Sequence, residues 1–145
     1  MKKVPIKAVF KENRKPVYGS SLASGADLFA DIDEPVRLQS LERCLIPTGL
    51  YLQIPEGFEA QVRPRSGLAI RHGLSLVNTP GTIDADYRGE IKVIAVNLGK
   101  DPVTVFPGDR IAQLVIAPVV QAEWIAVDRL EATGRGEGGF GSTGV

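Results

Sequence analysis

The sequence predicts a single all-β domain, and three observations support this. Sixteen glycines and ten prolines interrupt the chain at intervals too short for several long helices. Between them lie short segments in which apolar and polar side chains alternate with a period of two, the pattern of half-buried strands. The length of 145 residues is typical of one domain. Many short strands separated by frequent turns indicate a sandwich or a barrel.

The first clear strands lie in the second third of the chain. Residues 50–54 and 58–63 each have an apolar side chain at every second position. The segment Ser66–His72 is the one stretch that favours a short helix, and Gly73 directly after it is suited to the left-handed position that ends a helix. We therefore expect one short helix between strands.

Three further strands are predicted beyond this helix. Residues 91–96 are apolar on both faces apart from Lys92, which indicates a strand in the middle of a sheet. Residues 103–105 alternate again and precede a Pro-Gly turn. Residues 111–120 form a nearly continuous apolar run, typical of a strand that is buried on both sides.

Composition excludes several classes of function. The net charge is zero, with 17 basic and 17 acidic residues, which argues against a nucleic acid as partner. Cys44 is the only cysteine and His72 the only histidine, so neither an internal disulfide nor a zinc-type Cys/His cluster is expected. The sequence begins without a signal-peptide pattern and contains no apolar run long enough to span a membrane. We expect a cytoplasmic protein with no membrane partner.

Two clusters in the first half of the chain carry candidate functional groups. Asp27, within Ser24–Leu28, is a candidate functional carboxylate; the alternative is an ordinary turn residue, because an aspartate close to a glycine is common in turns. In Pro64–Leu68, Arg65 and Ser66 stand where the predicted helix begins, so a guanidinium, a hydroxyl and main-chain amides converge where an anion could bind. The alternative is an ordinary N-cap serine beside a solvated arginine.

The third cluster lies in residues 78–89, between a Pro-Gly turn and Gly89. It presents Asn78, Asp84 and Tyr87 together. A carboxylate such as Asp84 beside a phosphate could deprotonate a water, which is a general-base role. We interpret Asp86 as a solvated turn carboxylate near an arginine.

The last two clusters are Gln113 and the C-terminal tail. Gln113 interrupts an apolar strand, and a buried amide requires hydrogen-bond partners. Residues 133–144 contain six glycines together with Arg135 and Phe140, the groups needed to close over a phosphorylated nucleotide. A P-loop is excluded because Ser142 stands where the lysine is required. A disordered glycine-rich tail is the remaining alternative.

Taken together, the five clusters resemble the trimeric dUTPase family. The matching segments are SGADLFA, PRSGLA, NTPGTIDADYRGEI, GDRIAQ and RGEGGFGSTG, in this order from Ser24 to Gly144. The resemblance implies a jelly-roll-like β-barrel in a homotrimer that hydrolyses dUTP to dUMP and pyrophosphate with Mg²⁺. This reaction limits uracil incorporation into DNA and supplies dUMP for thymidylate synthesis.

The resemblance also assigns roles to individual residues. Asp84 matches the general base. Mg²⁺ is held by the triphosphate and water, and Asp27 would help to hold the site or the waters of the metal rather than be a direct ligand. Residues 1–132 would form the barrel and residues 133–145 a lid over the active site. The implied substrate-binding residues are Arg65, Ser66, Gly67, Asn78, Gly81, Thr82, Tyr87, Lys92, Gln113, Arg135, Phe140, Gly141 and Ser142.

Two other interpretations share the fold. The dCTP deaminase family has a segment similar to the third cluster, but with a catalytic glutamate five residues after a glycine (G-x-x-x-x-E). In this sequence the residue five positions after Gly89 is Ile94. A relative that binds nucleotides without catalysis would be expected to lack Asp84, Arg135 or Phe140, and all three are present.

Overall fold

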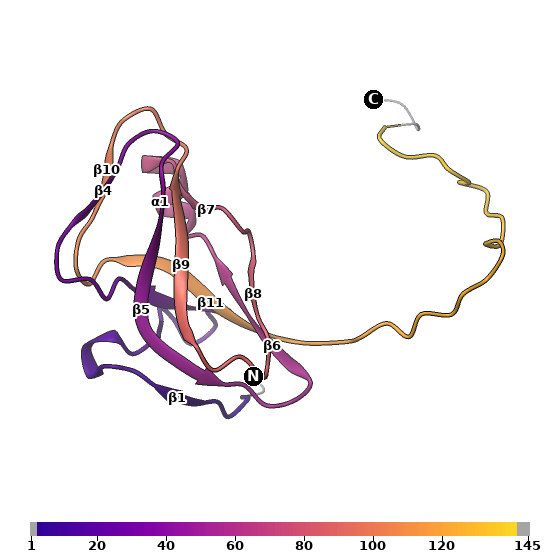
Figure 1. Cartoon of the computed structure of the whole chain (residues 1–145), viewed down its shortest axis with the longest axis horizontal. Coiled ribbons are helices and arrows are strands. Elements are labelled where there is room, and N and C mark those ends of the chain that lie inside the picture. The colour runs from indigo at the N-terminus through magenta and orange to yellow at the C-terminus, as the bar shows by residue number, and fades with distance from the viewer. Residues whose placement is uncertain (1–2, 142–145) are drawn as a thin grey trace.

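The computed structural model describes residues 3–141 and shows two antiparallel sheets that close around one core (Figure 1). The first sheet has four strands and a long central pair. Its order is β1 (Lys7–Val9), β5 (Arg43–Gln53), β9 (Glu90–Asn97) and β7 (Leu74–Leu76).

The second sheet has five strands, and it contains most of the predicted functional segments. Its order is β2 (Val17–Tyr18), β3 (Gly25–Phe29), β11 (Arg110–Pro118), β6 (Phe58–Arg63) and β8 (Gly81–Ile83). A two-stranded pair, β10 (Val103–Val105) with β4 (Val36–Leu38), and the 3-10 turn η1 (Glu12–Arg14) complete the barrel.

The core is built from the alternating apolar positions that the sequence indicates. Leu50 on β5, Val62 on β6 and Ile91 on β9 are buried and belong to one contiguous cluster. β9 lies between β5 and β7, and β11 lies between β3 and β6, so both strands expected to be central are central. The predicted jelly-roll-like all-β fold is confirmed.

The helix prediction is also confirmed. Helix α1 spans Ser66–His72, and Gly73 follows in the left-handed conformation with φ of 69°. A side chain at Gly73 would come within 2.7 Å of the Gly99 Cα, so both the backbone conformation and the close approach require glycine here.

One boundary prediction is wrong. Strand β11 ends at Pro118, whereas the apolar run suggested a strand to residue 120; Val120 is 95% exposed. The predicted start of α1 at Ser66 is correct, and the alternative interpretation of Ser66 as an N-cap serine is not, because the N-cap is Arg65. Apolar content alone does not tell a buried strand from an exposed apolar segment, because that difference depends on neighbouring strands.

Beyond β11 the chain leaves the barrel as an extended arm, which Figure 1 shows running away from both sheets. Large apolar side chains on it, including Trp124 and Leu130, are exposed. In the described part of the chain, no helix has the length and apolar character needed to span a membrane.

Candidate active site

A carboxylate held between two arginines joins three of the predicted segments. Asp27 on β3 lies 3.0 Å from Arg65 through Oδ1 and Nε, and 3.2 Å from Arg110 through Oδ2 and NH1. Arg65 also donates from NH1 to the main-chain oxygen of Arg110 at 3.1 Å. Asp27 is therefore no solvated turn carboxylate. It fixes two guanidinium groups at one end of the five-stranded sheet.

Gln113 lies beside this cluster, on the strand that pairs with β3. On β11 it is opposite Asp27 on one side and Arg63 on the other. Its Nε2 donates to the main-chain oxygen of Pro64 at 3.1 Å, which explains how a half-buried amide is tolerated here. One amide hydrogen remains available for a second acceptor.

Gly25 makes room for the Gln113 side chain. A Cβ at Gly25 would overlap the Gln113 Oε1 and lie 3.1 Å from its Cδ and 3.2 Å from its Cβ. Gly25, in the first of the five clusters, therefore controls the position of the Gln113 side-chain amide in the fourth. The sequence did not reveal this contact, because the two residues meet only when β3 and β11 pair.

The start of α1 faces outward beside the same cluster. Ser66 is exposed, and because the Leu68 and Ala69 amides both donate to the main-chain oxygen of Arg65, the first-turn amides without an acceptor in the helix are those of Ser66 and Gly67. The side-chain atoms nearest to a Cβ at Gly67 would be those of the Arg71 guanidinium, the first at 3.0 Å. These amides, the Ser66 hydroxyl and Arg65 form a cationic, donor-rich surface suited to phosphate groups.

A second group of predicted residues surrounds a separate hollow of about 450 Å³. It brings together Thr82 from β8, Asp84 and Tyr87 from the following loop, and Lys92 from β9. Ile94 lies in the same wall, so an apolar side chain occupies the position at which the deaminase pattern has a glutamate. Glu90 lines it as well, 3.8 Å from the Lys92 Nζ, so two carboxylates, an aromatic ring and a cation surround the hollow.

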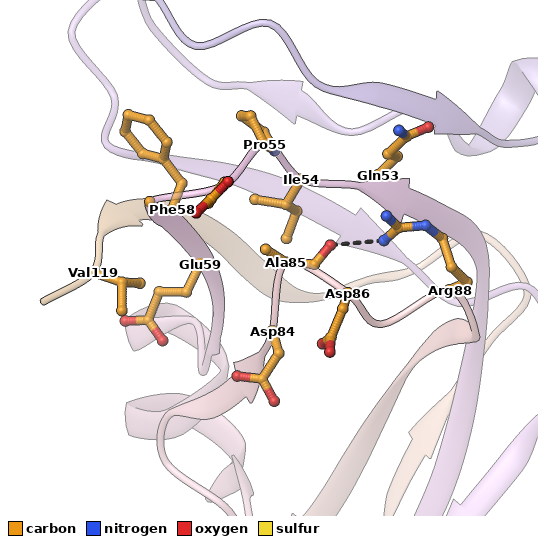
Figure 2. Close-up of a pocket in the computed structure, with 12 residues that line it drawn as sticks. Gln53, Ile54, Pro55, Phe58, Glu59, Asp84, Ala85, Asp86, Arg88 and Val119 are labelled. Carbon is orange, nitrogen blue, oxygen red and sulfur yellow. Dashed lines mark hydrogen bonds between the residues drawn. The ribbon is translucent and has the colours of Figure 1, made fainter. Parts of the chain in front are cut away.

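The loop that carries Asp84 also borders a neighbouring pocket of about 500 Å³ on its other side. Figure 2 shows the loop crossing this pocket, with the Arg88 guanidinium turned back onto the main-chain oxygen of Ala85. Arg88 NH1 donates to the oxygens of Ala85 and Tyr87 at 2.7 and 3.0 Å. Asp86 is exposed as expected, but Arg88 binds these carbonyl groups, so its main role is to close the loop.

The turn before β8 carries Asn78, which is exposed, and contains a cis Thr79–Pro80 peptide. A Cβ at Gly81 would lie 3.1 Å from the Asn78 Nδ2 and 3.4 Å from the Val62 Cβ. Because Gly81 has no side chain, the Asn78 amide can lie against the start of β8.

The two groups of residues are well separated within one chain. Ile83 pairs with Ala60 on β6, and Arg65 lies five positions further along the chain. Strand β6 ends at Arg63, three positions beyond Ala60, so at about 3.3 Å per residue Ile83 lies about 10 Å from that end of the strand. Asp84 follows Ile83 and Arg65 follows Arg63, and the two residues line different pockets. A single chain therefore does not bring the predicted general base to the predicted phosphate-binding residues.

The tail is separate from both groups. Arg135 and Phe140 are exposed, and Arg135 donates from Nε to the main-chain oxygen of Gly138 at 2.8 Å. Gly136 donates to the main-chain oxygen of Thr133 at 3.1 Å, which forms a local turn. Gly141 has a φ of 83°, and Ser142 lies outside the described residues. The tail is thus locally ordered around Arg135.

Sequence reasoning missed Arg110. The residue stands directly after a Gly-Asp turn, where an arginine at a strand start looks solvated; only the pairing of β11 with β3 brings it to Asp27. Within residues 3–141, no group of three or more histidine, cysteine or acidic side chains is arranged to hold a metal ion.

Comparison with known proteins gives one consistent result. The sequence model of the dUTPase family matches residues 11–144. The chain is 52% identical over 145 residues to the deoxyuridine 5'-triphosphate nucleotidohydrolase of Fusobacterium nucleatum, covering 99% of both chains. It is 63% identical over 129 residues to the enzyme of the same name from Anaeromyxobacter sp., covering 89% of this chain and 86% of that one.

Solved structures agree. The dUTPase of Staphylococcus bacteriophage 80alpha with dUpNHpp superposes with a TM-score of 0.86 at 28% identity, covering 97% of this chain and 99% of that chain. A variant of the dUTPase of phage phi11 of S. aureus, described with a structural Mg(II) ion, gives a TM-score of 0.78 at 25% identity, covering 88% and 99%.

Proposed function

Because this chain belongs to the dUTPase family and hydrolyses dUTP to dUMP and pyrophosphate, we propose that Asp84 activates the attacking water in active sites shared between three copies of the chain. The observation that carries the proposal is the hollow that Asp84, Tyr87 and Lys92 line together. A carboxylate there can take a proton from a water that attacks the α-phosphorus.

The separation of the two groups supports sharing between copies. Asp84 lies on the loop after β8, whereas Arg65 and Gln113 lie at the other end of the sheet. Catalysis requires both within reach of one triphosphate. A second copy would supply Arg65, Ser66, Gly67 and Gln113, and the exposed apolar side chains of the arm, such as Trp124, are suited to packing on a neighbouring chain.

The hollow, together with the turn before β8, would select the nucleoside. Asn78 and the main chain of Gly81 and Thr82 would pair with the edge of uracil, and Tyr87 would pack against the sugar. A cytosine would leave buried donors and acceptors unpaired. A 5-methyl group would clash with the rigid turn before β8, and such a clash discriminates more strongly than a lost contact does.

The tail would complete the site from a third copy. Phe140 would stack on uracil, Arg135 and Ser142 would bind the γ-phosphate, and Gly141 would allow close approach of the main chain. Ordering such a segment costs roughly 1–2 kcal/mol per residue, so closure would depend on the bound triphosphate. In this proposal residues 133–145 act as a lid on the barrel of residues 1–132.

The residues present fit a magnesium ion held mainly by the substrate. Both oxygens of Asp27 are already paired with guanidinium groups, so this carboxylate is placed to orient Arg65 and Arg110 rather than to be a direct ligand. Mg²⁺ commonly keeps several waters and binds through substrate phosphates. When bound, it would neutralise the charge of the triphosphate.

The first experiment is pyrophosphate release, with Mg²⁺, from dUTP, dTTP, dCTP and UTP side by side. Release from dUTP alone supports both the reaction and the selection of base and sugar. Ammonia release from dCTP would indicate a deaminase, and no release by the folded protein would indicate a relative that only binds nucleotides. Release from several of the four would contradict the account of selectivity.

A further inference from the structure

Gly89 lies against the hydroxyl end of the Tyr87 side chain. A Cβ at Gly89 would overlap the tyrosine hydroxyl and come within 2.5 Å of Cζ and 3.0 Å of Cε2. Gly89 is not among the glycines with positive φ, so no left-handed backbone conformation requires glycine here. The requirement for glycine here is therefore steric, and the group that imposes it is Tyr87.

The ring is held against the main chain by a second contact. The Tyr87 hydroxyl donates to the main-chain oxygen of Glu90 at 3.1 Å. Glu90 is itself fixed, because its Oε1 accepts a hydrogen bond from the Gly49 amide on β5 at 2.9 Å. The ring thus lies on two consecutive residues of the chain, one of which has no side chain and the other of which is anchored to the neighbouring strand.

The outer face of the same ring remains open. Tyr87 is 45% exposed and lines the hollow together with Asp84 and Lys92. Because the hydroxyl end of the ring rests against Gly89, the height of the ring in this hollow is set by how closely that end approaches the main chain. A single added carbon at Gly89 would move the ring away from the main chain and into the space that faces the hollow.

We propose that Gly89 is a specificity-determining positioning residue: its missing side chain sets the height at which the Tyr87 ring accepts a 2′-deoxyribose and rejects a ribose. This inference rests on the proposed packing of Tyr87 against the sugar. A displaced ring fits the deoxyribose less closely, whereas UTP, which is already rejected, loses little. The ratio of kcat/KM for dUTP to that for UTP should therefore fall.

The test compares Gly89→Ala, Tyr87→Ala and the double variant with the unsubstituted protein. For each, kcat and KM are measured for dUTP and UTP with Mg²⁺, and thermal unfolding reports the folded state. Gly19→Ala is the matched control, because a Cβ there meets nothing within 4 Å. We expect Gly89→Ala to lower the dUTP/UTP ratio by roughly tenfold, the low end of what one carbon discriminates in a fitted pocket, and Gly19→Ala to leave it unchanged.

The double variant shows whether Gly89 acts through Tyr87. In the Tyr87→Ala background, Gly89→Ala should cause little further change in the ratio, because the displaced ring is absent. A folded Gly89→Ala protein with unchanged selectivity overturns the inference, as does an equal loss of selectivity in both backgrounds. If Gly89→Ala does not fold, Gly89→Ala/Tyr87→Ala should fold, and its failure to fold also overturns the inference.

Failure of the underlying assignment has a different result. If Tyr87→Ala itself leaves the dUTP/UTP ratio unchanged, Tyr87 does not select the sugar, and the proposed function is wrong at that residue whatever Gly89→Ala does. If Tyr87→Ala lowers the ratio and Gly89→Ala does not, only the inference about Gly89 fails.

Discussion

Arg65 Nε and Asp27 Oδ1 lie 3.0 Å apart and thereby join the second and first of the five functional segments. Asp27 also contacts Arg110, so one carboxylate orients two guanidinium groups on the side of the barrel that we assign to the phosphates. Replacing Asp27 by asparagine would place the amide NH2 group opposite the N–H of one guanidinium, so that two hydrogen-bond donors would face each other.

We therefore expect Asp27→Asn to raise the KM for dUTP by roughly tenfold, equivalent to the ~1.4 kcal/mol of one charge-assisted hydrogen bond. The measurement is steady-state pyrophosphate release, together with binding of a non-hydrolysable dUTP analogue. Asp33→Asn, at an exposed carboxylate, is the control. Equal KM values in the two variants would show that Asp27 does not organise the phosphate-binding side.

Asp84→Asn should abolish most of the turnover without loss of substrate binding. The amide cannot accept the proton of the attacking water, so kcat should fall by roughly 10²–10⁴, the usual contribution of a general base. Binding of the dUTP analogue, measured by calorimetry, should stay near its original value. Asp86→Asn is the matched control, because Asp86 is an exposed carboxylate on the same loop. A near-normal kcat in Asp84→Asn would remove Asp84 as the base.

Deletion of residues 134–145 should leave the barrel folded and nearly inactive. Residues 120–137 are exposed, so shortening the arm removes little packing from the core. Thermal unfolding should be almost unchanged, while kcat/KM for dUTP should fall strongly because the lid groups Arg135 and Phe140 are lost. Size-exclusion chromatography checks the assembly. Full activity in the shortened protein would contradict the lid assignment.

Gly25→Ala should reproduce the effect of removing Gln113. The added methyl group would overlap the end of the Gln113 side chain and lie 3.2 Å from its Cβ, so the Gln113 side chain must move. We expect the KM for dUTP to rise in Gly25→Ala and in Gln113→Ala, and the double variant to resemble Gln113→Ala alone. Additive effects on KM would show that Gly25 acts by another route.

Asn97→Ala should destabilise the barrel more than any surface change. Asn97 is fully buried, and its Nδ2 donates to the main-chain oxygens of Leu38 and Asp101 at 3.0 and 2.9 Å. Its Oδ1 accepts from the Gly99 amide at 2.9 Å. Loss of the amide leaves three polar groups unpaired, so the free energy of unfolding should fall by about 2–4 kcal/mol in denaturant titration. Asn13→Ala, at an exposed site, should have little effect.

The local features of this protein follow from its sequence, because they depend on neighbouring residues. Alternating side chains identified β6 and most of β9, and the helix Ser66–His72 with Gly73 after it was predicted to the residue. The five segments also indicated the family, since residue types in that order and spacing carry the chemistry. These features require no knowledge of which strands are neighbours.

Strand pairing decided the rest, because contacts between distant segments depend on register and on which strands lie side by side. The pairing of β3 with β11 placed Arg110 on Asp27 and Gln113 over Gly25. The pairing of β6 with β8 separated Asp84 from Arg65 within one chain. The apolar run to residue 120 shows the same limit, since its last residues find no neighbouring strand and remain exposed. The sequence determined which groups the protein carries, and the tertiary structure determined which of them meet.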